Sequence, residues 1–588
     1  SKEDTAQVTI SDATLKTINF VDADKAVQGN IAADKATELT INSGKVEAAA
    51  NAVVTAASAT NISINAAQDT AGLTLTAGKL TDLTVNNKGA FALTGTNTAL
   101  DSVKNLNVNA EGAFSVGTID SLKNLNNLTV NGVTADLSGV SVGTATLSSL
   151  EANVNVSGDF KLGTTDAKGD IDFNIENVTA LNLGAITSST GNASVIISSA
   201  TGAVTLGTVS AVNGNVTLNA GNALGAVTLG NITGDIVSID LGGVLGTINN
   251  TATKVSITSN EVVYVGSEIS KNVVEITAAA GGTDLNAQMI GGANSSDSLT
   301  LKGAANTQSI TASGDLSGGT LALTLTDAVK LNSIDISGLK GITSPVAIDL
   351  AKVKHTDNKL VVDIQGSDAA ETITANTTDA AVTAITLSGD LGGGANTVTV
   401  APTSGATGIK TIDLSGLSAT GGTLESTITH LSQQIALTTI IGSVGDDTIT
   451  IGKANADLTV TGGAGNDTFI VTAAHTTAGG TEHTTIADFS AGDKITFAAA
   501  VAGYQHSTAD LSSAGTLKAA IDAVLTNNDT AQTVYGFTYG GANYLYYNST
   551  NGETTTVATD TLVKLSGNVD LDSISLNTGT ATGDITIA

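Results

Sequence analysis

The chain has 588 residues, of which only 13% are charged, yet its formal net charge is -30. A nucleic-acid-binding protein needs a basic face to displace counterions from phosphates, and 24 cationic side chains against 54 acidic ones do not provide one. The same balance excludes attachment to an anionic membrane surface by charge alone. Carboxylates in such excess favour calcium ions, which prefer hard oxygen ligands.

The remaining composition bounds the fold class. Hydrophobic residues make up 41% of the chain and are regularly spaced, which argues against disorder. No apolar run is long enough for a transmembrane helix. The chain lacks Cys and does not begin with Met, so we expect an exported protein seen as a fragment or in processed form.

Short alternating strands dominate the first part of the chain. Leu83, Leu106 and Leu128 open similar apolar–polar runs at steps of about 22–23 residues, with Gly, Asn or Asp near their ends. Farther on, the phrases Val204–Gly207, Val216–Leu218 and Val227–Gly230 recur about 11–12 residues apart. A repeat of that length is typical of β-solenoid rungs, in which each strand stacks on its equivalent one turn later. A series of immunoglobulin-like sandwiches is the alternative, but such cores are usually rich in aromatic residues.

A longer repeat follows. Gly292, Gly366 and Gly442 are almost evenly spaced, and each precedes an acidic residue, a hydroxyl residue and an aliphatic residue. These copies indicate module duplication with a period of roughly 75 residues. The predicted regions are a repetitive solenoid-like region at 1–250, diverged modules at 251–437, a calcium-binding β-roll at 438–500 and a C-terminal domain at 501–588.

The last part of the chain has a different composition, because most of the aromatic residues lie there. An apolar stripe predicts a helix over Thr516–Asn527, with Thr516 as its N-cap. A hairpin is expected next, with strands Val534–Tyr539 and Asn543–Asn548 and a turn at Gly540-Gly541. These elements predict a compact domain with its own core. The fold class is therefore all-β, an elongated β-solenoid with a β-roll and a small domain containing one helix.

The strongest motif is Gly462–Ile470, which matches the nine-residue pattern G-G-x-G-x-D-x-U-x, where U is a large apolar residue. Its glycines allow positive φ and so aim backbone carbonyls at one point, where the aspartate adds a carboxylate. A related copy spans Gly442–Thr450, and Asp457 belongs to a degenerate copy between them. An ordinary Gly-Asp turn before a strand is the alternative reading. The candidate calcium ligands of these copies are Gly442, Val444, Gly445, Asp446, Asp447, Asp457, Gly462, Ala464, Gly465, Asn466 and Asp467.

Copies that have lost glycines supply further candidate ligands. Asp297 and Glu371 come from the longer repeat, and Asp315 and Asp390 follow Ser-Gly turns.

The catalytic motifs in the sequence are weaker than the glycine-rich calcium motif. Gly139–Gly143 matches the G-x-S-x-G elbow, but no helix is expected after it, and H-E-x-x-H is absent. His475 and His483 are interpreted as loop residues. The sequence therefore predicts no enzyme, and a solenoid glycosidase or lyase is the enzymatic alternative.

The run Gly462–Val471, followed by Asp488-Phe489-Ser490-Ala491-Gly492-Asp493-Lys494-Ile495, resembles the end of RTX (repeats-in-toxin) proteins. Together with the Thr/Ala/Gly/Asn-rich body and the tail Thr561–Ala588, it resembles surface-layer (S-layer) proteins that Gram-negative bacteria export by type I secretion. This resemblance adds Asp488 and Asp493 to the candidate calcium ligands.

The resemblance implies a secreted structural subunit that binds several Ca²⁺ ions and assembles with its own copies into a two-dimensional lattice on the cell surface. It also implies an uncleaved C-terminal secretion signal, and anchoring to outer-membrane polysaccharide through a region outside this chain. The alternative is a fragment of an RTX-type adhesin.

Overall fold

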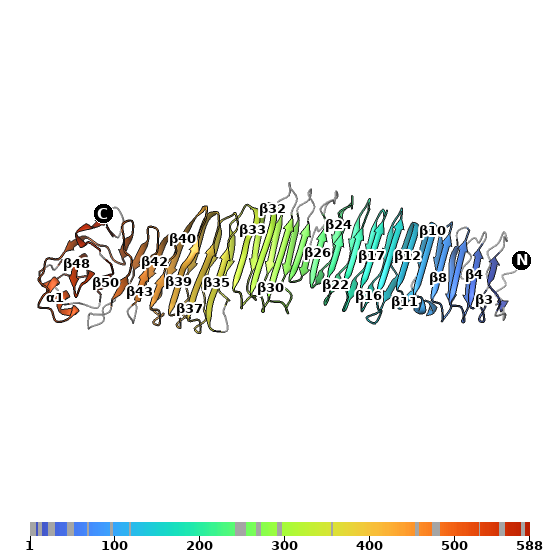
Figure 1. The fold of residues 1–588 in the computed structure, drawn as a ribbon, viewed down its shortest axis with the longest axis horizontal. Helices are drawn as coiled ribbons and strands as arrows, with labels where there is room; N and C mark the ends of the chain where they lie inside the picture. Colours follow the sequence, from blue (N-terminus) through green and yellow to red (C-terminus); the bar gives the residue numbers. More distant parts are fainter. Residues whose placement is uncertain are drawn as a thin grey trace. The chain divides into compact units, whose positions relative to one another are not determined.

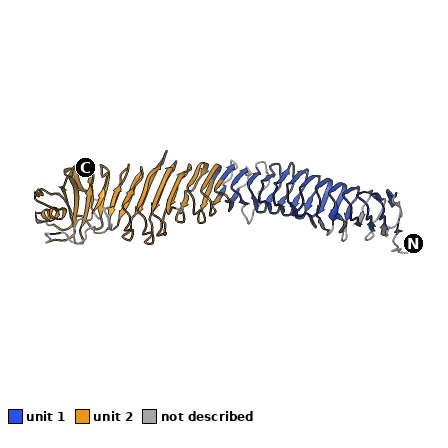
Figure 2. Cartoon of the chain, turned by 60° about the horizontal axis from the view of Figure 1, so that its bottom comes forward, with its two compact units in different colours: residues 1–279, 286–299, 314–318 blue, residues 280–285, 300–313, 319–588 orange. Residues whose placement is uncertain are grey.

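The computed structural model covers the whole chain and describes most of it. The described residues are 8–9, 14–20, 30–43, 52–67, 70–93, 98–116, 119–241, 255–265, 272–290, 297–353, 357–452, 458–472, 483–527, 530–551, 555, 559–567, 569–577 and 583–587. Two compact units divide the chain: unit 1 is residues 1–279, 286–299 and 314–318, and unit 2 is residues 280–285, 300–313 and 319–588 (Figure 2). This division does not test the four predicted regions.

Unit 1 is a parallel β-solenoid, whose strands follow one another turn by turn in Figure 1. A complete turn contains three strands, as in β17 (Ile171–Glu176), β18 (Leu181–Leu183) and β19 (Ile186–Ser188). Each of them pairs in parallel with its counterpart one turn later: β20 (Ala193–Ile197), β21 (Val204–Leu206) and β22 (Val209–Ala211). The solenoid predicted from the sequence is confirmed, and the sandwich alternative is wrong.

The bounds of the other strands of unit 1 follow in chain order. They are β1 Val8–Thr9, β2 Thr17–Phe20, β3 Asn30–Ala32, β4 Glu38–Ser43, β5 Ala52–Thr55, β6 Asn61–Ala66, β7 Thr70–Thr76, β8 Asp82–Asn87, β9 Phe91–Leu93, β10 Asn105–Val116, β11 Ile119–Leu122, β12 Asn127–Leu137, β13 Val140–Gly143, β14 Leu150–Val156, β15 Phe160–Leu162, β16 Thr165–Ala167, β23 Val216–Asn219, β24 Val227–Leu229, β25 Ile232–Gly234, β26 Ile236–Asp240, β27 Val255–Thr258, β28 Glu261–Val265 and β29 Val273–Thr277. A 3₁₀ helix, η1, spans Thr98–Ser102.

The register shows how the sequence repeat maps onto the turns. Leu83 pairs with Leu106 and Leu106 with Leu128, so the step predicted between these leucines is one full turn. Val204 also pairs with Val227, one turn away, whereas Val216 lies on another wall of the solenoid and pairs with Ala193. The shorter rung predicted from these phrases was therefore wrong. Two walls of one turn carry the same Val-Thr-Leu phrase because both bury alternate residues, and the phrase does not distinguish them.

The interior of the solenoid is filled by apolar, mostly aliphatic side chains at alternate positions of each strand. In β17, for example, Ile171, Phe173 and Ile175 are fully buried, whereas the residues between them face solvent. Aromatic residues also stack between turns: the rings of Phe91 and Phe114 are 6.1 Å apart and nearly parallel. Burying these rows of apolar side chains is the main source of stability.

Unit 2 begins as a solenoid with two facing parallel sheets, and each turn contributes one strand to each sheet. The first sheet contains β33 Ser333–Ile342, β35 Lys359–Gln365, β37 Ala384–Asp390, β39 Thr411–Ser418, β41 Thr439–Ile441, β43 Leu458–Thr461 and β45 Thr484–Ile486. The second contains β34 Val346–Asp349, β36 Glu371–Thr374, β38 Gly394–Val400, β40 Gly422–Thr429, β42 Asp446–Ile451, β44 Thr468–Val471 and β46 Lys494–Phe497. Strands β30 (Asp284–Ile290), β31 (Ser298–Lys302) and β32 (Ser309–Thr324) contain residues of both units.

The C-terminal elements close the last turn of both sheets. They are β47 Gly503–His506, α1 Leu517–Asn527, β48 Thr533–Tyr539, β49 Ala542–Asn548, β50 Thr561–Leu565, the 3₁₀ helix η2 Leu571–Ser573, β51 Ile574–Asn577 and β52 Asp584–Ile587. Strand β50 pairs with β45 in the first sheet, and β52 pairs with β46 in the second. The predicted helix, its Thr516 cap and the hairpin are confirmed, since the Thr516 hydroxyl accepts the Ala519 N–H at 3.2 Å.

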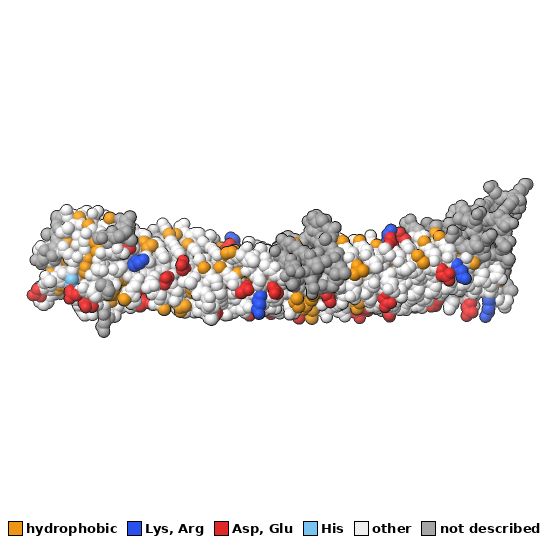
Figure 3. Space-filling model, turned by 90° about the horizontal axis from the view of Figure 1, so that it is seen from above, with side chains coloured by type: hydrophobic (Ala, Val, Ile, Leu, Met, Phe, Trp, Pro, Cys, Tyr) orange, Lys and Arg blue, Asp and Glu red, His pale blue; other side chains and the backbone are white. Residues whose placement is uncertain are grey.

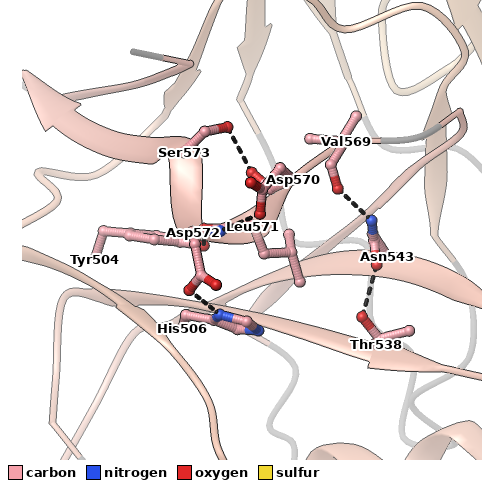
Figure 4. A network of polar contacts seen from close by, with 9 residues as sticks. All are labelled: Tyr504, His506, Thr538, Asn543, Val569, Asp570, Leu571, Asp572 and Ser573. Atoms are coloured by element: carbon pink, nitrogen blue, oxygen red, sulfur yellow. Dashed lines mark hydrogen bonds and ion pairs between the residues drawn. The ribbon is translucent and has the colours of Figure 1, made fainter.

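Polar contacts hold the segment around η2 against the other C-terminal elements, which together we call the C-terminal cap (Figure 4). The Tyr504 hydroxyl donates to the Leu571 carbonyl at 2.8 Å, and His506 Nδ1 lies 2.6 Å from Asp572 Oδ1. The Asn543 amide donates to the Val569 carbonyl at 2.6 Å. Beneath them, α1 packs Ile521 and its apolar neighbours on the tyrosines of the hairpin, and these residues form one hydrophobic cluster. No described helix has the length and apolar character needed to cross a bilayer.

Candidate metal centre

Three buried aspartates follow one another on successive turns of the second sheet of unit 2. Asp447 lies in β42, Asp467 directly precedes β44, and Asp493 directly precedes β46. The strand register aligns all three, and each is at most 2% exposed. The Asp447 N–H donates to Asp467 Oδ1 at 3.0 Å, and the Asp467 N–H donates to Asp493 Oδ1 at 2.9 Å. We call this row the carboxylate column.

The sequence predicted all three members as candidate ligands, Asp447 and Asp467 from the glycine motif and Asp493 from the family resemblance. Asp447 and Asp467 are one full turn apart and lie at neighbouring strands of one sheet. The acid between them, Asp457, lies outside the described residues. A calcium ligand role for it stays a prediction.

Serine residues satisfy two of the three carboxylates. Asp447 accepts the Ser443 N–H at 2.6 Å, the Ser443 hydroxyl and the Ser426 hydroxyl. Asp493 accepts the Ser490 N–H at 2.7 Å and the Ser490 hydroxyl at 3.1 Å. These donors stabilise the charged form and partly offset the cost of burial, which still raises the pKa of Asp447 to about 6.

Asp467 has no such serine. A glycine, Gly463, occupies the place that corresponds to Ser443, and among the described residues its carboxylate accepts only the Asp447 N–H. Burial raises the pKa of Asp467 to about 7, and the negative charges of Asp447, Asp493 and Asp488 add to the rise. A buried carboxylate in this position is costly unless a cation or a proton compensates its charge.

The glycines of the motif make room for the carboxylates. A Cβ atom at Gly442 would overlap both the Gly462 carbonyl oxygen and Asp447 Oδ2, and one at Gly462 would overlap Asp467 Oδ2. Gly463 and Gly465 have φ of 114° and 124°, which only glycine adopts readily. Backbone carbonyl and carboxylate oxygens therefore face the same small spaces, as hard oxygen donors do around Ca²⁺.

The two remaining acids of this region have local roles. Asp488 accepts the N–H groups of Gly462 and Gly463 at 2.9 and 2.8 Å, so it fixes the glycine loop. Asp446 is exposed and accepts the Asn466 N–H at 2.8 Å. Val444 is half exposed, and Ala464 lies in the same kind of loop one turn later.

The residues present fit Ca²⁺ better than a transition metal, with one restriction. Among the described residues, no three acidic or histidine side chains converge closely enough to hold a metal by themselves. A cation here would therefore take its ligands from one carboxylate of the column and from backbone carbonyls of the glycine loops. Bound Ca²⁺ would supply the positive charge that Asp467 lacks.

Candidate ligands predicted outside this region do not join the column. Glu371 is fully buried and accepts the N–H and hydroxyl of Ser367 at 2.8 and 2.7 Å, and its second carboxylate oxygen has no hydrogen-bond partner among the described residues. Its register partner is Asn396, whose side-chain oxygen accepts the Glu371 N–H. Burial raises the pKa of Glu371. Glu371 thus repeats the serine–acid arrangement in the same sheet, three turns before Asp447.

Three further candidates make hydrogen bonds away from the column. Asp297 is buried in unit 1 and accepts the N–H and side-chain amide of Asn272, both at 2.9 Å. Asp315 is exposed and accepts the Ser317 N–H at 2.7 Å. Asp390 accepts N–H groups from Thr420 and Gly392, and hydrogen bonding from Thr420 lowers its pKa.

Sequence reasoning missed the serines. Ser443 stands four residues before Asp447, Ser367 four before Glu371, and Ser490 three before Asp493. This spacing is visible in the sequence and separates acids with their own donors from Asp467.

The elbow serine, Ser141, lies in strand β13 and accepts the Thr164 hydroxyl at 3.0 Å. His483 packs edge-on against Tyr544, and His475 lies outside the described residues. The chain matches no protein-family model and no curated protein.

Proposed function

We propose that this chain is a structural subunit of a calcium-dependent surface layer, secreted by a Gram-negative bacterium and assembled from copies of itself. The observation that supports it most is Asp467, a buried carboxylate that lies between two other carboxylates and has one internal hydrogen bond. A folded state with this charge is stable only when the charge is neutralised, and the glycine loop offers further oxygens for Ca²⁺.

The proposal links this site to secretion. Extracellular calcium sites have dissociation constants of about 10⁻⁴–10⁻³ M, so they are empty in the cytosol and filled outside. Without Ca²⁺ the net charge of -30 opposes compaction, which suits a chain that must be exported unfolded. Outside the cell, metal binding contributes to the free energy of folding.

The lattice role draws on the regular solenoid and on the sequence resemblance to S-layer proteins. Stacked turns present the same backbone spacing and short polar side chains along the length of each sheet, and such faces suit repeated contacts between copies. The proposal assigns the chain no catalytic activity.

The test uses the full purified chain. It is freed of metal with a chelator, titrated with CaCl₂ or MgCl₂, and followed by negative-stain electron microscopy and thermal unfolding. We expect an increase in unfolding temperature and the appearance of ordered two-dimensional arrays with Ca²⁺, and neither with Mg²⁺. If Ca²⁺ stabilises the protein but the protein stays strictly monomeric at millimolar Ca²⁺, the lattice is contradicted and the adhesin is favoured. An unfolding temperature independent of Ca²⁺ would contradict the metal site.

A further inference from the structure

Unit 1 has a groove of about 740 Å³ that is lined by residues of the neighbouring strands β6, β8, β10 and β12. Four asparagines, one from each strand, run along it: Asn65, Asn86, Asn109 and Asn131. Small apolar residues form the rest of the groove, including Ala67 and Val133, both exposed. Among the described residues that line it are one Lys, one Glu and no aromatic residue.

The four asparagines form a hydrogen-bonded ladder across the turns. The amide of Asn86 donates to Asn65 Oδ1 at 2.8 Å, that of Asn109 to Asn86 Oδ1 at 2.8 Å, and that of Asn131 to Asn109 Oδ1 at 3.3 Å. Each bond fixes the rotation of the amide that donates it. The ladder therefore presents a fixed row of identical polar groups.

The ladder uses only part of the hydrogen-bonding capacity of each amide. A primary amide has two N–H donors and two acceptor lone pairs, and the ladder takes one of each from Asn86 and Asn109. A second donor and a second lone pair remain at every turn, and among the described residues they have no protein partner. These groups recur at the strand spacing of about 4.8 Å.

The floor of the groove adds one acceptor that the protein does not satisfy. Asn87 is 1% exposed, and its amide nitrogen donates to the carbonyls of Gly89 and Gly112. Its Oδ1 has no hydrogen-bond partner among the described residues. A ladder built only for stability would not leave a buried acceptor unpaired beside it.

We propose that this groove binds a neutral, unbranched polysaccharide that lies along the ladder, with one sugar ring for each turn. Hydroxyl groups both donate and accept, so they pair with amides that offer one donor and one acceptor. An extended β-linked chain of pyranose rings advances by about one strand spacing per ring. The apolar walls at Ala67 and Val133 contact the ring faces.

Charge selects against the other polymers. The chain carries -30 overall and the described lining of the groove holds a single Lys, so an anionic polysaccharide or nucleic acid finds no cationic row there. Charged side chains are also sparse on the face drawn in Figure 3. A polypeptide strand along the groove would run across the turns, so it could not pair with the backbone of any one strand. Because the described lining of the groove lacks aromatic platforms, the affinity for each sugar is low and depends on several rings binding together.

The experiment measures binding of the full chain to β-1,4-linked gluco-oligosaccharides and xylo-oligosaccharides of one to eight sugars, by calorimetry in saturating CaCl₂. Polygalacturonate serves as the anionic probe. We expect affinity to increase with length up to about four sugars, the number of ladder asparagines in the groove, and then to level off. The double variant Asn86→Ala/Asn109→Ala should bind about tenfold more weakly, because it loses several hydrogen bonds of modest strength.

Two further variants keep the proposal testable if that ladder also stabilises the fold. Asn105→Ala/Asn127→Ala removes a second ladder on the same strands β10 and β12, where Asn127 donates to Asn105 at 2.7 Å outside the groove. It should bind as the unsubstituted chain does. Ala67→Arg fills the groove and leaves every ladder amide in place, and it should abolish binding.

Several results would overturn the inference: no binding of any neutral oligosaccharide, stronger binding of polygalacturonate, affinity that does not depend on length, or equal losses in the two ladder variants. The inference does not depend on the proposed function, because the groove lies in unit 1 and the carboxylate column in unit 2. A chain that binds glycans without forming calcium-dependent arrays would contradict only the surface layer.

Discussion

At the scale of single residues, the three members of the carboxylate column differ in how their charge is compensated. Ser443 and Ser490 donate to Asp447 and Asp493, while Gly463 leaves Asp467 with one internal donor. The same glycine that completes the nine-residue motif thus removes a hydrogen-bond donor. In the proposed function, a cation compensates the charge where the motif is most complete, and a serine takes over part of that role where the motif has diverged.

The variant Asp467→Asn removes the charge of the side chain and keeps its shape, so it isolates the effect of the buried charge on stability. The amide keeps an oxygen to accept the Asp447 N–H but removes a buried charge, so the metal-free variant should be more stable than the unsubstituted chain by about 1–3 kcal/mol. It should also lose most of the stabilisation by Ca²⁺. Thermal unfolding with and without Ca²⁺ measures both effects.

Asp447→Asn is the matched control. Its amide would bring an N–H group against the Ser443 and Ser426 donors, so this variant should be less stable in either condition. Lower metal-free stability of Asp467→Asn than of Asp447→Asn would contradict the contrast between the two sites.

His430 is a second buried group whose charge state matters. It is 1% exposed, and its ring nitrogens have no hydrogen-bond partner among the described residues, so burial lowers its pKa below the usual 6.5. Below pH 6.5 the unfolded chain binds a proton that the folded chain does not bind, and the free energy of unfolding falls as the pH falls. The loss ends once the pH passes the lower, folded-state pKa.

The variant His430→Leu should therefore lose less stability between pH 7 and pH 5 than the unsubstituted chain. One proton contributes at most about 1.4 kcal/mol per pH unit. Urea unfolding at several pH values, monitored by tyrosine fluorescence of unit 2, measures the two slopes. Equal slopes would contradict a difference in His430 protonation between the folded and unfolded states.

At the scale of elements, sequence pattern alone predicted an all-β chain with one helix, the repeated strands named above and the C-terminal hairpin. Leu83, Leu106 and Leu128 pair as their spacing indicated, because each step spans one turn. The predicted size of a turn was wrong where the Val-Thr-Leu phrase recurs on two walls. The alternation of apolar and polar residues shows that a strand is buried on one side, but not to which wall the strand belongs. Asp447, Asp467 and Asp493 were each predicted as candidate ligands, but their alignment on successive turns and the serines that distinguish them required the strand register and the local hydrogen bonds.

The hairpin between β48 and β49 depends on the backbone of its turn. Gly540 and Gly541 have φ of 60° and 79°, and a Cβ on either would meet no atom within 4 Å. Only backbone conformation therefore opposes substitution. Gly541→Val should destabilise unit 2 by about 1–2 kcal/mol, whereas Gly541→Asn should cost much less, because Asn tolerates the left-handed region. Chemical denaturation of both variants measures the difference, and equal losses would indicate a steric cause.

At the scale of the whole molecule, the C-terminal elements cover the end of the solenoid in unit 2. A parallel sheet that ends without a partner exposes a row of N–H and carbonyl groups, which favours uncontrolled association. Here β50 covers β45 and β52 covers β46, so the last solenoid strand of each sheet is paired with a C-terminal strand. We therefore expect ordered assembly to use side-chain faces and not the backbone edges of β45 and β46.

A chain truncated after residue 498 exposes both edges, because it lacks α1 and strands β47 to β52. We expect it to associate into irregular, growing particles with or without Ca²⁺, since backbone pairing at an open edge needs no metal. The intact chain should associate only with Ca²⁺ if its assembly uses faces organised by the carboxylate column. Dynamic light scattering of both proteins, at one concentration and across a calcium titration, distinguishes the two modes. A truncated chain that stays monomeric without Ca²⁺ would show that these edges do not control association, and the role of the cap would then be limited to stabilising the last turn.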